Sequence, residues 1–384
     1  MLAVMTLVCR ANDLERIALF SHFPELTSRI PWVPLGNWPT PIERLAHPRH
    51  VAGGDHIWIK REDQSSPAYG GNKVRTLEAH MGRALAEDAD RIWGVGAFGS
   101  NHALATAVHA PRASLSAGIA LFPQPPSTPA RENLRSVLAQ RPQIAPVTNV
   151  ALLPFVLASI RRDNLRTAGE RHYVMAPGGA TPIGALGHVS AALELAEQVE
   201  RGECPPFRHL VIAVGSTCTT AGLLVGLHIA AKLGIGFGKN GRQPPHVTAV
   251  RVTPWPITSP VRVALLAEGT ARLLENLIGR VARIDYGTLR ASLTLTRRYF
   301  GLGYGRPTRS GRRAQRTMEL AGGPSLDVVY AAKSGAALFD LARRAGVGPI
   351  VFWSTKSSAP LPEATTEDIA RAPRQMRQWL RQIS

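Results

Sequence analysis

Short apolar, β-branched runs alternate with longer segments of helical period along most of the chain after about residue 55. Short runs of this kind are typical of buried strands, whereas apolar positions three or four residues apart are typical of helices. The predicted strands are 56–60, 91–96, 116–122, 172–176, 209–214, 246–253 and 349–354, and the predicted helices are 72–87, 102–109, 130–140, 152–166, 182–201, 220–233, 310–320 and 334–345. Repeated strand–helix units predict an α/β fold with mainly parallel sheets covered by helices.

One uncharged run, residues 210–231, is long enough to cross a bilayer. Its middle, from Gly215 to Thr220, contains glycine, serine, threonine and cysteine, which suit a polar turn better than hydrocarbon. We therefore predict a buried strand, a turn and a buried helix here, and no membrane partner. In parallel sheets, ligands bind at the carboxyl ends of the strands, where such turns meet.

The chain has 384 residues and a formal net charge of +18, and hydrophobic residues make up 45% of it. This composition excludes a collagen, a disulfide scaffold and a wholly disordered chain. Six lysines among the 45 basic residues leave 39 arginines, spread along most of the sequence. Arginine pairs occur at 161–162, 297–298, 312–313 and 343–344, at helix-like positions. We interpret them as solvated helix faces rather than as a surface for nucleic acid, which is the alternative.

The three cysteines, Cys9, Cys204 and Cys218, are far apart and odd in number, with no CxxC pair and no histidine cluster at ligand spacing. Neither a disulfide framework nor a metal site is predicted. The apolar segment 1–9 lacks a preceding basic region and a small-residue cleavage site. A cytoplasmic location is therefore the default expectation.

The first candidate loop runs from Tyr69 to Arg75 and contains two glycines, Asn72 and Lys73. The glycines allow a tight turn or a close approach to a ligand, and Asn72 is expected to cap the following helix. Lys73 then falls in the first helical turn, where the positive end of the helix dipole disfavours an ammonium. A lowered pKa suits an amine that acts as a nucleophile, and an exposed lysine near a turn is the simpler alternative.

Two further loops each connect a predicted strand to a predicted helix. Residues 96–102 include Ser100 and Asn101, which either help to bind an anion or form an ordinary capped turn. Residues 215–222 form a small, hydroxyl-rich turn at a helix N-terminus, which is typical of phosphate binding. Neither the GxxxxGK[ST] nor the GxGxxG pattern is present, so a small phosphorylated cofactor is favoured over a triphosphate or a dinucleotide.

Six motifs, in this order, resemble the pyridoxal-phosphate enzymes of the D-cysteine desulfhydrase and 1-aminocyclopropane-1-carboxylate deaminase family. They are Gly-Gly-Asn-Lys at 70–73, Ser-Asn-His at 100–102, the glycine-rich segment 176–187, the turn 215–222, Gly-Tyr-Gly at 303–305, and Asp-Val-Val-Tyr at 327–330 with Lys333. The resemblance covers about residues 39–355. It implies the two-domain tryptophan synthase β-like fold (fold type II), with a small α/β domain at 76–181, a large cofactor-binding domain formed by 1–75 and 182–384, and a homodimer.

The resemblance also implies a role for each candidate residue. Lys73 forms the internal Schiff base with pyridoxal 5′-phosphate and moves the α-proton of a small amino-acid substrate. Ser100 lies beside the substrate carboxylate as a candidate acid or base, and Tyr304 lines the substrate pocket. The cofactor-binding residues besides Lys73 are Asn72, Asn101 at the phenolic oxygen, Gly215, Ser216, Thr217, Cys218 and Thr219 at the phosphate, and Thr355 at the pyridine nitrogen. The implied reaction is a β-elimination that yields a keto acid and ammonia.

The chain departs from the family's pattern at several positions. Gly322 stands where we align a glutamate that pairs with the pyridine nitrogen in the deaminases, so cyclopropane deamination is disfavoured. Lys356 and Ser357 replace two glycines after Thr355, and Thr76 replaces a lysine that assists the phosphate in many relatives. These changes leave open a diverged protein that binds the cofactor or an amino acid with little or no lyase activity.

Overall fold

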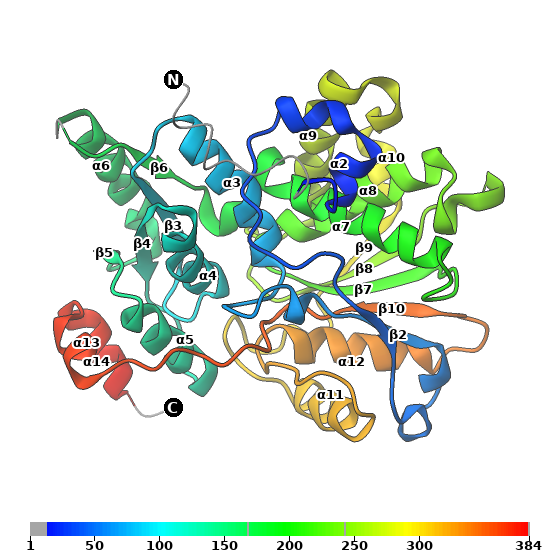
Figure 1. Ribbon diagram of the computed structural model, residues 1–384. Helices are drawn as coiled ribbons and strands as arrows, with labels where there is room; N and C mark the ends of the chain where they lie inside the picture. The colour runs from blue at the N-terminus through cyan, green and yellow to red at the C-terminus, as the bar shows by residue number, and fades with distance from the viewer. Residues whose placement is uncertain (1–13, 167–168, 242, 383–384) are drawn as a thin grey trace.

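The computed structural model describes residues 14–166, 169–241 and 243–382, so the segment 1–9 with Cys9 lies outside the described residues. It contains two sheets flanked by helices (Figure 1). The six-stranded sheet has the order β1 (Ile42–Arg44), β2 (Ile57–Lys60), β10 (Ile350–Trp353), β7 (His209–Val214), β8 (His246–Arg251), β9 (Leu293–Thr296). The four-stranded sheet has the order β5 (Gln143–Pro146), β4 (Ser116–Phe122), β3 (Arg91–Ala97), β6 (His172–Val174). All neighbouring strands are parallel except β1 and β2.

The helices lie largely where the periodicity predicts them. The described α-helices are α2 (Ala18–His22), α3 (Lys73–Ala86), α4 (Asn101–His109), α5 (Thr128–Ala139), α6 (Leu153–Arg166), α7 (Pro182–Glu200), α8 (Cys218–Leu233), α9 (Pro260–Ile278), α10 (Tyr286–Ala291), α11 (Arg309–Leu320), α12 (Ala331–Ala342), α13 (Thr366–Arg371) and α14 (Arg374–Arg381). The predicted α/β class with mainly parallel sheets is confirmed, and the run 210–231 is β7, a turn and α8. Among the described residues, every helix is too short or too polar to span a membrane.

The elements that the periodicity missed are mostly short and peripheral. Strands β1, β5 and β9 contain three or four residues each and lie at sheet edges, where polar side chains interrupt an apolar run. Helix α9 is long and had a local signal, since Ser259 caps it and Pro260 occupies its first turn. The arginine pair 297–298 was predicted at helix-like positions, but it lies in a loop after β9.

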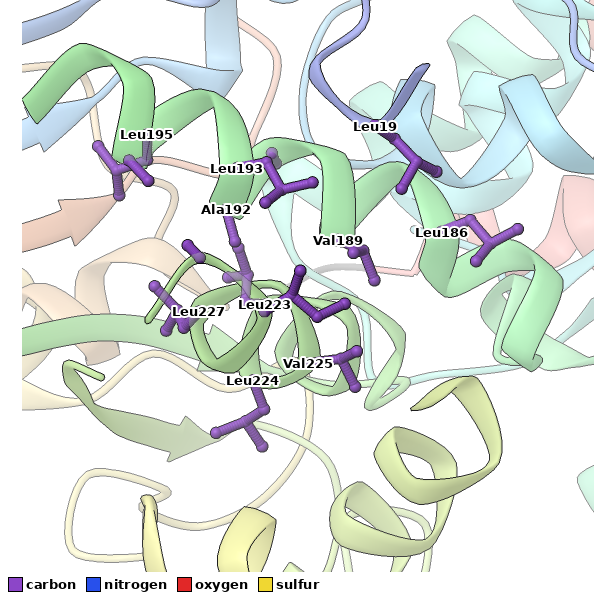
Figure 2. Packing of buried hydrophobic residues seen from close by; sticks show 14 of the residues in the cluster. Leu19, Leu186, Val189, Ala192, Leu193, Leu195, Leu223, Leu224, Val225 and Leu227 are labelled. Carbon is purple, nitrogen blue, oxygen red and sulfur yellow. The ribbon is translucent and has the colours of Figure 1, made fainter. Parts of the chain in front are cut away.

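The centre of the larger core is the pair of buried helices α7 and α8, whose leucine and valine side chains interdigitate (Figure 2). Glycines allow the helix backbones to approach closely. A Cβ built on Gly226 of α8 would lie 2.5 Å from the carbonyl oxygen of Val189, and a Cβ on Gly187 of α7 would lie 2.2 Å from that of Arg75 in α3. Helix α7 therefore holds α3 on one side and α8 on the other.

The C-terminal tail returns to the side of the four-stranded sheet, near α5 (Figure 1). The ring of Trp379 packs edge-on against Phe98 at 5.2 Å between centroids, and its Nε1 donates a hydrogen bond to the Gln124 carbonyl at 2.6 Å. The tail is therefore packed against the rest of the chain. The tail thus contacts the proposed small domain although its residues were assigned to the large one; the boundaries at 76–181 stay a prediction.

We expect Gly226→Ala to destabilise the protein by about 1–3 kcal/mol, because the added methyl group would overlap the Val189 carbonyl of the neighbouring helix. The matched control is Gly269→Ala in α9, where the nearest atom outside the helix is 3.5 Å from the built Cβ. This control should be neutral or stabilising by up to about 1 kcal/mol, since alanine favours helix over glycine. Urea unfolding of the three proteins measures both effects; equal changes in the two variants would contradict close packing at Gly226.

Candidate functional site

The lysine loop and the end of β10 are joined at the carboxyl edge of the six-stranded sheet. Gly71, with φ of +92°, forms an isolated antiparallel bridge with Lys356, and the Asn72 N–H donates to the Thr355 carbonyl at 3.1 Å. A Cβ on Gly71 would lie 2.6 Å from that same carbonyl oxygen. Thr355 is therefore brought beside the lysine loop through its backbone, and its role at the pyridine nitrogen stays a prediction.

Lys73 is the first residue of α3, and its amine faces two segments that are distant in sequence. Its Nζ donates to the Gly178 carbonyl and to the Ser216 hydroxyl, both at 3.1 Å. Burial lowers the pKa of Lys73, and the nearby thiol of Cys218 opposes this shift. The sequence argument attributed a lowered pKa to the helix dipole, whereas removal of the amine from water is the larger cause here.

Asn72 occupies the position before α3 but does not cap the helix through its side chain, so that expectation is wrong. Its backbone has helical angles, and its amide nitrogen instead donates to the hydroxyl of Thr219 at 2.7 Å. An N-cap side chain needs an extended backbone to reach back to the first N–H groups. Asn72 thus ties the lysine loop to the start of α8.

The turn after β7 has the backbone form of an anion site. Thr217 adopts the left-handed conformation, with φ of +73° and ψ of −22°, and α8 begins at Cys218. A left-handed residue before a helix directs successive N–H groups to the same side, which suits a phosphate. The Gly215 carbonyl faces the other way and accepts hydrogen bonds from the hydroxyls of Thr253 and Thr258, which anchor the turn.

The side chains of this turn have different surroundings. Ser216 packs against Gly178, where a built Cβ would lie 2.4 Å from the Ser216 Cβ. The thiol of Cys218 is fully buried and directed at the Gly179 carbonyl at 3.4 Å, so Cys218 can offer a ligand only its N–H group. The hydroxyl of Thr219 is shared between Asn72 and the His188 Nε2, the latter at 3.2 Å.

Three buried histidines lie beneath the lysine amine. The His80 Nε2 faces the Gly179 carbonyl at 3.1 Å, the His188 Nε2 faces the Thr76 hydroxyl at 3.0 Å, and His102 would contact a Cβ on Gly179. Burial lowers the pKa of His80 to about 4 and the pKa of His102 and His188 still more clearly. These rings are therefore neutral near pH 7 and add no positive charge beside the amine.

Ser100 and Asn101 lie where β3 leads into α4. The Ser100 hydroxyl caps α4 by accepting from the Ala103 N–H at 3.2 Å. The Asn101 Oδ1 accepts hydrogen bonds from the Tyr69 hydroxyl at 3.1 Å and from the Asn133 amide at 2.7 Å. These two contacts leave the amide nitrogen of Asn101 without a partner in the described parts of the chain, ready to donate to a ligand oxygen. Tyr69 belongs to the first candidate loop, but no role was assigned to it, and Asn133 lies outside every motif that the sequence singled out.

Tyr304 pairs with Tyr330, a second tyrosine that the motif Asp-Val-Val-Tyr contained but to which no role was assigned. Their hydroxyls are 2.6 Å apart and their rings pack edge to face at 6.2 Å. A Cβ on Gly215 would lie 3.6 Å from the Tyr330 ring, so this ring borders the anion turn. Burial raises the pKa of both phenols, which therefore stay protonated.

Gly322 does not lie at the site. It follows α11 in a left-handed turn, and a Cβ built there would meet Ala46 and His47. The alignment that placed a ring-pairing carboxylate at this position is therefore wrong, and Gly322 is no longer an argument against cyclopropane deamination. Thr76, which replaces a lysine of many relatives, is buried and bonded to His188.

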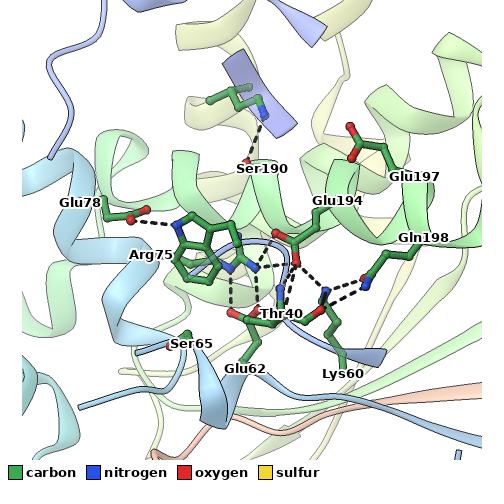
Figure 3. Close-up of polar contacts among 12 residues, drawn as sticks. Thr40, Lys60, Glu62, Ser65, Arg75, Glu78, Ser190, Glu194, Glu197 and Gln198 are labelled. Atoms are coloured by element: carbon green, nitrogen blue, oxygen red, sulfur yellow. Dashed lines mark hydrogen bonds and ion pairs between the residues drawn. The ribbon is translucent and has the colours of Figure 1, made fainter. Parts of the chain in front are cut away.

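A network of buried charges supports α3 from behind (Figure 3). The Arg75 guanidinium donates to both Glu62 oxygens at 2.7 Å and to Glu194 at 3.0 Å, and Lys60 donates to Glu194 at 2.5 Å and to Gln198 at 2.6 Å. Burial of an unpaired charge is costly, so each carboxylate needs its cations. Since Arg75 follows Lys73 by two residues, the network also sets where the amine lies.

Glu78, on the same helix, has its Oε1 surrounded by the N–H groups of Leu35, Gly36 and the Trp38 ring, yet burial raises its pKa to about 7. A folded-state pKa above the unfolded value of about 4.3 means that folding favours the protonated acid. This stabilisation is present below about pH 4.3 and is lost as the pH rises through about 7. We therefore expect the free energy of unfolding of wild type, relative to Glu78→Gln, to fall by about 1–3 kcal/mol between pH 5 and pH 8.

Urea unfolding at both pH values tests this expectation, with the exposed Glu132→Gln in α5 as the matched control. Glutamine keeps the acceptor oxygen of Glu78 and cannot ionise. A difference between wild type and Glu78→Gln that is the same at pH 5 and pH 8 would contradict the raised pKa.

Taken together, the site residues define an α/β enzyme that holds a small phosphorylated cofactor beside a lysine amine. The anion turn offers N–H groups, Lys73 lies 3.1 Å from that turn's serine hydroxyl, and Asn101 presents an unpaired amide nitrogen. One molecule with a phosphate for the turn, a reactive carbonyl for the Lys73 amine and a phenolic oxygen for the Asn101 amide would occupy all three positions. These residues fit pyridoxal phosphate.

The chain belongs to the family described as pyridoxal-phosphate dependent enzyme, whose model matches residues 33–355. Its cofactor is pyridoxal phosphate. This membership favours the enzyme hypothesis over a nucleic-acid binder and over a binder without catalysis.

Curated relatives and solved structures agree. A D-cysteine desulfhydrase of Salmonella paratyphi A is 32% identical over 342 residues, covering 87% of this chain and 96% of that protein. A Pyrococcus furiosus protein, provisionally assigned as a 1-aminocyclopropane-1-carboxylate deaminase, is 32% identical over 84% of this chain and 90% of its own length. The crystal structure of an ACC deaminase homologue has a TM-score of 0.70, 29% identity, and coverage of 89% and 95%. The fold-type II assignment is confirmed, and the chain is a pyridoxal-phosphate-dependent enzyme similar to lyases and deaminases.

Proposed function

We propose that this protein catalyses β-elimination from a small amino acid, in the manner of a D-cysteine desulfhydrase, giving a keto acid and ammonia. The observation that carries the proposal is the amine of Lys73, 3.1 Å from both the Ser216 hydroxyl and the Gly178 carbonyl at the edge of the anion turn. The 32% identity to a D-cysteine desulfhydrase over most of both chains supports this class of reaction.

Pyridoxal phosphate, when bound, withdraws electrons from the α-carbon of an attached amino acid, so that its proton can be removed and a β-leaving group can depart. Lys73 takes the α-proton, a role for which its lowered pKa supplies the neutral amine. The hydroxyl of Ser100 and the N–H groups at the start of α4 orient the substrate carboxylate. Tyr304, paired with Tyr330, borders the substrate and excludes water from it.

The remaining residues hold the cofactor. The N–H groups of the turn from Gly215 to Thr219 bind the phosphate, and the left-handed Thr217 supports this role. Asn101 donates its free amide to the phenolic oxygen, Thr355 meets the pyridine nitrogen, and Asn72 keeps the two halves of the site together through Thr219.

We also propose a homodimer and a cytoplasmic location. Trp255, Ile257, Val261 and Leu265 leave 73%, 45%, 51% and 54% of their surface exposed along one side of the α9 N-terminus, which is a cluster typical of an interface between copies. The same loop carries Thr258, which anchors the anion turn, so pairing here would also steady the cofactor site. The free, buried thiols of Cys204 and Cys218 support a reducing compartment.

The protein purified with pyridoxal phosphate should show a visible absorbance band that borohydride bleaches, with the adduct on Lys73 in a peptide map. Lys73→Ala should lose the adduct and at least about 1000-fold in keto-acid formation, because both the covalent link and the proton acceptor are removed. The surface variant Lys239→Ala is the matched control and should keep both. Cysteine and β-chloroalanine, each as both enantiomers, are the test substrates. A stable band without keto acid from any of them, or from cysteate and O-phosphoserine, would overturn the lyase proposal.

Trp255→Asp combined with Leu265→Asp should convert the dimer to a monomer in light scattering after gel filtration, since a charge would be buried on both sides of the interface. The matched control is Leu320→Asp on α11, an equally exposed apolar position at 63% on another face. A wild-type protein that is monomeric at micromolar concentration, or a dimer that survives the double substitution, would contradict this interface.

A further inference from the structure

Lys356 is held next to the reacting centre by the backbone on both of its sides. It follows Thr355 directly and forms the antiparallel bridge with Gly71, two residues before Lys73. The next residue, Ser357, accepts hydrogen bonds from the N–H groups of Gly70 at 2.8 Å and of Ala359 at 3.1 Å. The two residues that stand in place of the family's glycines therefore act differently. Ser357 holds its own loop against the lysine loop by hydrogen bonds, and Lys356 places a cation at the site.

Lys356 lines the same small cavity as Asn101, Tyr304 and Tyr330. An acidic residue, Asp327, also lines this cavity, and backbone N–H groups donate to both oxygens of its carboxylate. One of its oxygens accepts from the N–H groups of Val329 and Tyr330 at 3.0 and 2.7 Å, and the other accepts from that of Ala331 at 3.0 Å. These backbone donors fix the carboxylate at the start of α12, and within the described residues it forms no ion pair with Lys356.

Among the described residues, the ammonium of Lys356 has no acceptor of its own. Within residues 14–166, 169–241 and 243–382, no hydrogen bond and no carboxylate within 4.0 Å is found for its Nζ, although the side chain is half-buried. By contrast, the fully buried Lys60 and the buried Lys333 both have oxygen partners. A half-buried cation without a partner favours an anion that arrives with the substrate.

We infer that Lys356 selects amino acids whose β-substituent carries a negative charge, a sulfonate or a phosphate ester, and that this anion is the leaving group. The inference rests on the proposed function and names its substrate class. The substrate's α-carboxylate lies at the start of α4, and its second anion lies at Lys356, which lines the same cavity as Asn101.

The reaction balances without an oxidant or a reductant. The Cα–H bond breaks and the proton passes to Lys73, and the Cβ–S or Cβ–O bond breaks and its electron pair leaves with sulfite or phosphate. The resulting aminoacrylate takes up water and gives pyruvate and ammonium. Because the leaving group gains charge as it departs, the Lys356 ammonium stabilises the transition state more than the bound substrate.

The test compares wild type, Lys356→Met and Lys356→Arg, with the surface variant Lys239→Met as the control. Pyruvate release is measured from both enantiomers of cysteate and O-phosphoserine, and from β-chloroalanine as the substrate without a second anion. Lys356→Met should lose at least about tenfold in kcat/KM for whichever anionic substrate wild type uses, and less than about twofold for β-chloroalanine. Lys356→Arg should retain most of the activity with the anionic substrate, because it retains the charge.

A binding measurement is independent of turnover. Aspartate and asparagine have the same shape and differ in one negative charge, and neither carries a good β-leaving group. Spectral titration of the holoenzyme should show aspartate binding at least about tenfold more tightly than asparagine in wild type, and equally in Lys356→Met.

The two levels of the hypothesis fail in different ways. A protein without the visible band, or with the band but with no keto acid from any substrate, overturns the proposed function. A protein that converts β-chloroalanine but neither cysteate nor O-phosphoserine, or in which Lys356→Met changes both classes by the same factor, overturns only the assignment of Lys356.

Discussion

The site depends on three helices being packed at backbone distance. Lys73 begins α3 and the anion turn begins α8, and the two meet because both helices lie against α7. Gly187 in α7 and Gly226 in α8 have no room for a side chain, since a Cβ on either would overlap a carbonyl oxygen of the neighbouring helix. Larger residues would push the helices apart and disturb the contact of the Lys73 amine with the Ser216 hydroxyl at 3.1 Å. Close helix packing is thus a condition of the chemistry.

The close packing of these helices also determines which side chains near the site carry charge. The amine of Lys73 is desolvated, and the three histidines beneath it are held neutral by the same burial, so the cofactor's phosphate would meet N–H dipoles and one lysine. The full charges of Arg75, Lys60, Glu62 and Glu194 lie behind α3, where they compensate one another. The protein therefore separates a structural charge network from a nearly neutral reaction site, and Lys356 is a cation left on the substrate side.

Two expectations from the sequence were wrong because the position of a residue depended on a segment far away in the chain. Asparagine is a residue type typical of a helix N-cap. In the structure, however, Thr219 at the start of α8 lies close enough to accept a hydrogen bond from the Asn72 amide instead. Gly322 was matched by its position along the chain, whereas the structure places it just after the C-terminal end of α11, against Ala46. Spacing along the chain does not show which contact forms, because the partner lies far away in sequence; Thr219, for example, is 147 residues from Asn72.

The sequence by itself determined the α/β class, seven of the strands, the buried β7–turn–α8 unit and the order of motifs that indicates pyridoxal phosphate. These features are local: apolar period, glycine positions and hydroxyl-rich turns act within a few residues. Only the tertiary structure decided which donors surround Asn101, that Tyr330 borders the anion turn, and that the C-terminal helices pack beside α5 and Phe98. It also decided that Lys356 forms no ion pair within the described residues. Each of these depends on contacts between segments far apart in the chain, and such contacts are set by how the helices and sheets pack, not by the residues next to them in sequence.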